Sequence, residues 1–162
     1  MPCRIVVSGG LPRSVGLARR ELASAAAFFA AKSAARSGLA FREVTVVLQD
    51  DAASADVHVA INGAEGPTDV VTQRYDPMPG EEPGVYGELY VNVARAIAVA
   101  PRRRGWSAAK ELLLYVAHGM DHLAEEDDTT PDGYERMRRR ELGWIRAIAH
   151  DGGKEYNFPK CF

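Results

Sequence analysis

The pattern of apolar and polar positions along the chain predicts a small β-sheet. Four short segments are rich in valine, leucine and other strand-forming residues, and turn-forming or acidic residues bound them, as is typical of β-strands. The second segment is apolar enough to lie inside a sheet. The predicted strands are Arg4–Ser8, Glu43–Gln49, Thr68–Tyr75 and Val85–Asn92.

Segments of helical periodicity separate these strands early in the chain and follow them later. The first is rich in alanine and is closed by Gly38, a typical helix C-cap. Residues 52–61 are compatible with a short helix or with a strand. The predicted helices are Val15–Ser37, Ala94–Ala100, Ser107–Leu123 and Tyr134–His150. The inner stripe of the last helix is predicted to be Tyr134, Met137, Glu141, Trp144, Ile145 and Ile148.

This order of elements indicates an α+β fold, in which a small mixed sheet of about four strands packs with helices. A chain of 162 residues is the size of one ordinary domain, and no repeat or low-complexity linker divides it. We therefore expect a single domain over residues 1–162, with residues 152–162 as a loosely packed tail. The chain has no signal-peptide pattern and no membrane-length apolar run, so a cytoplasmic location is expected.

Composition and charge narrow the possible partners. Apolar residues make up 46% of the chain and charged residues 26%, a balance typical of soluble globular proteins. The formal net charge of −2 gives no overall basic signature, so any contact with nucleic acid has to use a local patch. Arginines cluster in residues 102–104 and 136–140, although each cluster is also compatible with a solvated helix face. Cys3 and Cys161 have no C-x-x-C spacing and are expected to be free thiols.

Metal-binding chemistry concentrates in residues 118–128, HGMDHLAEEDD. His118 and His122 are four residues apart on a predicted helix, so their side chains share one face and form a metal-chelating pair. The acidic residues that follow offer a carboxylate as third ligand, and three protein ligands with one open position are typical of catalytic zinc. No glutamate follows His118 directly, so the base of an H-E-x-x-H peptidase is absent. The alternative is a solvated helix end; Gly119 disfavours it, because a glycine inside a helix costs about 1 kcal/mol and usually has a packing or functional reason.

Three stretches of the chain resemble, in order and spacing, the YbeY family of bacterial endoribonucleases of rRNA maturation. Residues 67–72, PTDVVT, are similar to the family's P-T-D-V-L-S-F, and residues 87–92, GELYVN, are similar to its G-D-I-x-I-S. Residues 118–128 are similar to its H-G-x-L-H-L-x-G-Y-D-H. The resemblance covers nearly the whole chain. It implies a zinc-dependent endoribonuclease whose partners are rRNA and the ribosome, with no role for a membrane.

The resemblance also implies a ligand set of His118, His122 and Asp128 for one Zn²⁺ per chain, since Asp128 aligns with the third histidine of the family. A carboxylate is an accepted zinc ligand, but it excludes manganese or magnesium less than a third imidazole would. In the implied mechanism the metal acidifies a water that attacks an RNA phosphodiester, with His118 and Asp128 at the reacting centre. The family carries a phosphate-handling arginine where this chain has Asn62, and Arg74 is the candidate catalytic replacement.

Other positions are further candidates for the site. Thr68 and Asp69 are expected to shape the floor of the substrate cleft, although Asp69 is equally suited to cap a strand end. Arg102 and Arg103 are candidates for phosphate contacts that carry no sequence information. Asp121 replaces an apolar position of the family motif and is expected to add a negative charge beside the site.

Three functions are compatible with these residues. The first is a metal-dependent endoribonuclease acting on rRNA. The second is a degenerate family member that binds RNA or the ribosome without cleaving it, which the changes at Asn62, Asp121 and Asp128 favour. The third is a metal-dependent hydrolase of a small substrate, for which the loss of the phosphate-handling arginine is no handicap.

Overall fold

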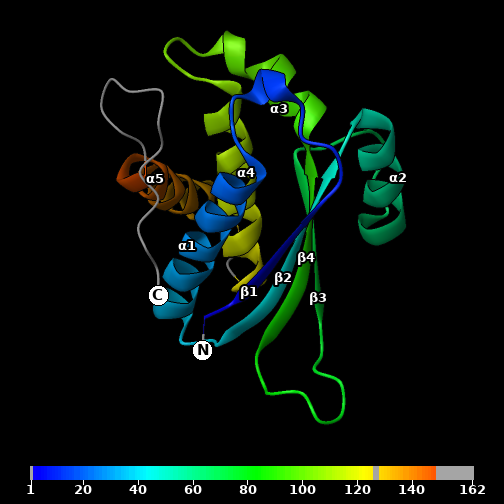
Figure 1. The fold of residues 1–162 in the computed structure, drawn as a ribbon, viewed down its shortest axis with the longest axis vertical. Coiled ribbons are helices and arrows are strands. Elements are labelled where there is room, and N and C mark those ends of the chain that lie inside the picture. Colours follow the sequence, from blue (N-terminus) through cyan, green and yellow to red (C-terminus); the bar gives the residue numbers. More distant parts are fainter. Residues whose placement is uncertain (1, 126–127, 149–162) are drawn as a thin grey trace.

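The protein folds around a four-stranded mixed sheet, which confirms the predicted α+β class. The computed structural model describes residues 2–125 and 128–148 (Figure 1). Its strands are β1 (Arg4–Ser8), β2 (Phe41–Gln49), β3 (Val70–Tyr75) and β4 (Val85–Asn92). The strand order is β1-β2-β4-β3, in which β1, β2 and β4 are parallel and β3 is antiparallel to β4.

Helices cover the two faces of the sheet unequally. Figure 1 shows α1, α4 and α5 on one side of the sheet and α2 on the other. The helices are α1 (Arg19–Ser37), α2 (Asp51–Asn62), α3 (Val93–Val99), α4 (Ala108–Leu123) and α5 (Pro131–Ile148), with short 3-10 turns η1 (Arg13–Val15) and η2 (Ala100–Arg102). In the part of the chain that the structure describes, no helix is both long and apolar enough to span a membrane.

Helix α4 is the central helix of the fold and contacts α1, α3, α5, β3 and β4. It begins at the predicted N-cap, where the Ser107 hydroxyl accepts a hydrogen bond from the Lys110 backbone N–H. A Cβ at Gly119 would lie 3.0 Å from side-chain atoms of both Leu89 and Val70. Glycine therefore lets α4 approach the sheet closely, and this packing reason confirms that Gly119 is not part of a solvated helix end. The buried apolar residues of α4 include Leu112, Leu113, Leu114, Val116, Ala117 and Met120.

The ambiguous residues 52–61 are helical, because they lie within α2. The Asp50 carboxylate accepts a hydrogen bond from the Ala53 N–H and so caps the start of this helix. The valines at alternate positions of this segment are also compatible with a strand. Most of the helix is nevertheless solvated, and Val59 is 52% exposed. The local cap, rather than burial of the valines, therefore specifies this helix.

Helix α5 begins at Pro131, three residues before its predicted start at Tyr134. The Thr130 hydroxyl accepts a hydrogen bond from the Gly133 N–H, and the Thr130 carbonyl accepts one from the Tyr134 N–H. A threonine cap followed by proline at the first helical position is a favourable start for a helix. Tyr134 was also assigned to the inner stripe, but it is 44% exposed. The rest of the predicted stripe is buried: Met137, Glu141, Trp144, Ile145 and Ile148. The predicted tail, residues 152–162, lies outside the described residues.

Candidate metal centre

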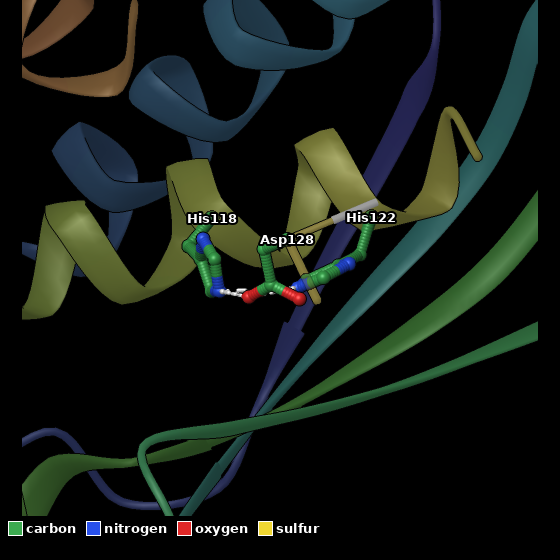
Figure 2. A group of neighbouring side chains, drawn as sticks. All are labelled: His118, His122 and Asp128. Carbon is green, nitrogen blue, oxygen red and sulfur yellow. Dashed lines mark hydrogen bonds and ion pairs between the residues drawn. The ribbon is translucent and has the colours of Figure 1, made fainter. Parts of the chain in front are cut away.

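Three side chains converge at the C-terminal end of α4. His118 and His122 lie one helical turn apart, and Asp128 comes back from the segment after the helix to meet them (Figure 2). The Asp128 Oδ2 atom is 3.3 Å from His118 Nε2 and 3.4 Å from His122 Nε2. The two Nε2 atoms are 3.0 Å apart. The structure thus brings together the three residues that the sequence assigned to a metal.

The donor atoms have the spacing that a tetrahedral metal requires. Bonds of about 2.0–2.1 Å at tetrahedral angles place neighbouring ligand atoms about 3.3–3.4 Å apart. The observed separations of 3.0, 3.3 and 3.4 Å are close to this value. Two imidazole nitrogens and one carboxylate oxygen are a donor set that zinc accepts. The side chains of His122 and Asp128 are 27% and 29% exposed, so a fourth ligand can arrive from solvent. The residues present therefore fit a divalent metal.

Glu141 of α5 orients the more buried histidine. Its Oε1 atom lies 2.7 Å from His118 Nδ1, and its side chain is fully buried. A proton on Nδ1 donated to this carboxylate leaves the lone pair of Nε2 directed at the cluster, as in many metal sites. Burial lowers the pKa of His118, but the hydrogen bond and the charge of Glu141, together with the charge of Asp69, outweigh it and raise the pKa above its usual value. In the metal-free protein, protons therefore compete with a metal for this histidine.

Replacing Glu141 with glutamine is expected to weaken metal binding without abolishing it. The amide preserves the shape but removes the negative charge that makes His118 a more basic ligand, so we expect the zinc dissociation constant to rise about 10-fold. Competition with a chromophoric chelator measures this constant. Glu111→Gln is the matched control, because Glu111 is also buried but bonds Trp106 Nε1 near the start of α4. An unchanged dissociation constant in Glu141→Gln would show that Glu141 does not tune the site.

Thr68 and Asp69 lie at the start of β3, beside the cluster. Asp69 Oδ1 accepts hydrogen bonds from the Val70 N–H at 2.7 Å and the Thr68 hydroxyl at 3.2 Å, so it does cap the strand. The charge of Asp69 also acts on His118. The two interpretations of this carboxylate are therefore compatible. A role of either residue in binding substrate stays a prediction.

Arg74 lies near the end of α4 but is engaged by another group. Its Nη1 atom is 2.8 Å from Glu125 Oε1 and 3.4 Å from the Leu123 carbonyl oxygen. The Glu125 side chain is 72% exposed, so this ion pair is weak and phosphate could compete for it. The structure therefore places Arg74 at the C-terminal end of α4, and its catalytic role stays a prediction.

Arg102 and Arg103 lie at the opposite end of α4. The Arg103 guanidinium stacks on Trp106, 5.0 Å from the ring centroid, just before the helix starts. Ten residues of helix separate Ala108 from His118, which corresponds to about 15 Å. The structure does not bring these arginines to the cluster, so they could contact only a distant part of a long substrate.

Asp121 does not face the candidate centre, contrary to the expectation from sequence. Its side chain is fully buried, with Oδ2 2.9 Å from Arg140 Nη2 and Oδ1 3.2 Å from Arg36 Nη2. Two arginines from α5 and α1 neutralise the carboxylate, because it lies on the flank of α4 that packs against these helices. Asp121 therefore adds no unpaired charge to the site.

The contact between Glu141 and His118 was not predicted from the sequence. Glu141 was expected in the inner stripe of the last helix, and the residue is indeed buried there. A carboxylate on an otherwise apolar stripe is costly to bury unless it is paired. That single anomaly was the signal in the sequence that Glu141 has a polar partner in the interior.

Fold and site together define an α+β domain built around one candidate metal centre of two histidines and an aspartate. Comparison with known proteins then identifies the family. The sequence model of Endoribonuclease YbeY matches residues 16–148. The chain belongs to the YbeY endoribonuclease family, as its motifs had indicated.

Individual relatives agree with this assignment. The chain is 35% identical over 120 residues to Endoribonuclease YbeY of Kineococcus radiotolerans, covering 68% of this chain and 69% of that protein. It is 36% identical over 132 residues to Endoribonuclease YbeY of Rhodopirellula baltica, covering 81% of this chain and 64% of that protein. The solution structure of TM1509 from Thermotoga maritima has the same fold, with a TM-score of 0.55 and 23% identity over 90% of this chain and 89% of that one.

Proposed function

We propose that this protein is a metal-dependent endoribonuclease that acts on rRNA during ribosome maturation. The observation that carries the proposal is the convergence of His118, His122 and Asp128 at metal-ligand spacing in a chain of this family. The relatives' shared name, Endoribonuclease YbeY, supports RNA as the substrate. It also favours cleavage over the two other functions, a non-catalytic RNA-binding protein and a hydrolase of small substrates.

The three residues would hold one divalent metal, for which we propose zinc. When bound, such a metal supplies Lewis-acid chemistry: it lowers the pKa of a nearby water and draws charge from a phosphate oxygen. His118 and His122 contribute neutral nitrogen donors, and Asp128 contributes one negative charge. Glu141 fixes the ring of His118, and Asp69 adds negative charge beside it.

The reaction is hydrolysis of a phosphodiester in RNA. A water oxygen forms a new bond to phosphorus, and the bond from phosphorus to one ribose oxygen breaks. The departing ribose oxygen takes up a proton, and the water loses one, so the products are a phosphate monoester and a hydroxyl. The exposed side of the cluster is where the phosphodiester would bind. We further propose that the ribosome is the partner, that the location is cytoplasmic and that the chain acts as one domain.

Metal removal and restoration test the proposal. Protein stripped with a chelator and then dialysed is expected to lose at least about 100-fold of its cleavage rate on a fluorescently labelled single-stranded RNA, because the Lewis acid is gone. Adding one equivalent of zinc is expected to restore the rate, and manganese and magnesium serve as comparisons. Equal cleavage before and after stripping, in a preparation free of metal by elemental analysis, would contradict the proposal.

A further inference from the structure

A half-buried arginine of α5 lies one helical turn before Glu141, the residue that orients His118. Arg138 is three residues before Glu141 and four residues after Tyr134, so the three side chains share one face of the helix. Glu141 on this face reaches His118 Nδ1 at 2.7 Å. The charge of Arg138 acts on His118, which is consistent with this register.

The guanidinium of Arg138 is positioned by the Tyr134 side chain. Its Nη2 atom donates to the Tyr134 hydroxyl at 3.0 Å, and its Cζ atom lies 5.4 Å from the centroid of the Tyr134 ring. Among the residues that the structure describes, no carboxylate lies within 4.0 Å of it. An arginine has five N–H donors, so most of them stay available to a ligand. Tyr134, which is itself 44% exposed, places the guanidinium at the surface beside the site.

The negative charges around the centre favour a cation close to a bound phosphate. Three carboxylates lie in or around the cluster: Asp128 as one of its ligands, Glu141 against His118, and Asp69 just before β3. A divalent metal offsets two of these negative charges and leaves one. A phosphodiester brings a further negative charge, so it would be repelled unless a cation is close. Arg138 supplies that cation, and the charges of Glu141 and Asp69 act on it in turn.

Four other arginines near α4 have partners away from the candidate centre. Arg74 pairs with Glu125, and Arg36 and Arg140 both pair with buried Asp121. Arg103 is stacked on Trp106 at the far end of the helix. Arg138, by contrast, has a position and surroundings that suit a phosphate at the centre.

We propose that the Arg138 guanidinium binds a non-bridging oxygen of the RNA phosphate that lies at the candidate metal centre. This inference rests on the proposed endoribonuclease function. The planar guanidinium matches two phosphate oxygens and keeps its charge at any physiological pH. It therefore stabilises the negative charge that gathers on the phosphate oxygens as water attacks. The same residue contributes to substrate binding in the ground state.

Substitutions at two arginines of α5 test the inference. Arg138→Gln is expected to lower kcat/KM for RNA cleavage about 100-fold, and Arg138→Lys to recover part of the loss, because lysine keeps the charge but not the fork geometry. Arg146→Gln is the matched control, since it removes the same charge from an exposed position of the same helix, outside the arginine cluster of residues 136–140. It is expected to stay within about 3-fold of wild type.

Binding of a 2′-O-methyl oligoribonucleotide to the zinc-loaded proteins distinguishes the loss of one phosphate contact from damage to the fold. Each phosphate contact on a single strand contributes about −0.7 to the slope of log K against log salt concentration, so Arg138→Gln should flatten the slope by about that amount. Zinc content and thermal midpoint should match wild type. The inference would be overturned if both Arg138 variants lost zinc or failed to fold. It would also be overturned if Arg138→Gln kept the wild-type slope and rate. In either case, RNA cleavage by the wild type would leave the proposed function standing. A wild type that neither binds nor cleaves RNA overturns both.

Discussion

Replacing His122 with alanine is expected to abolish metal binding and RNA cleavage together. The change removes one of three donor atoms, and Asp128 Oδ2 and His118 Nε2, which are 3.3 Å apart, cannot enclose a metal alone. We expect zinc affinity to fall at least about 1,000-fold and cleavage to fall by a similar factor, since the Lewis acid is lost. Elemental analysis of protein purified without chelator or affinity tag measures the first effect, and a labelled RNA measures the second.

His122 is a better target than His118 because its side chain is more exposed, whereas His118 contacts the buried Glu141. Removal of His118 would strand Glu141, whose side chain is fully buried, and the resulting instability would obscure the metal result. The His122 side chain is 27% exposed, so the metal-free variant should unfold within a few degrees of metal-free wild type. His58→Ala is the control, because His58 lies on α2 and bonds the Gly66 carbonyl away from the cluster. One zinc per chain retained in the His122 variant would refute the ligand assignment.

The strands and most helices could be predicted because local patterns specify them. β1 and β4 have the predicted bounds, and the caps at Ser107 and Gly38 lie where the sequence placed them. The start of α5 could not be placed from a Pro-Asp-Gly sequence, which suits a turn as well as a first helical turn. Only the cap at Thr130 decides between them, through its bonds to the following backbone.

The candidate site was predictable where residues share a helix and unpredictable where helices meet. His118 and His122 are fixed by helical spacing, and the family resemblance pointed to Asp128 as their partner. Which side of α4 faces α5 depends on packing between elements distant in sequence. For that reason the partner of Glu141 was missed, and Asp121 was assigned to the wrong surroundings.

That misassigned aspartate gives the second large effect, this time on stability. Asp121→Ala is expected to lower the free energy of unfolding by about 3–5 kcal/mol, because it leaves the Arg36 and Arg140 guanidinium groups facing an interior position without their shared carboxylate. In a domain of this size, the thermal midpoint should fall by roughly 10 °C. Urea unfolding followed by circular dichroism measures the change in free energy.

Comparison with an exposed ion pair tests whether burial causes the large loss of stability in Asp121→Ala. Arg4 and Glu43 are joined at 2.9 Å, but their side chains are 73% and 40% exposed, so Glu43→Ala should cost less than about 1 kcal/mol. Equal losses in the two variants would mean that the buried cluster contributes no more than a surface ion pair. We expect a large loss of stability in Asp121→Ala alone, with zinc affinity unchanged. That result would establish that the buried charge cluster on one flank of α4 joins α1, α4 and α5, independently of the metal-binding residues on the other face of the helix.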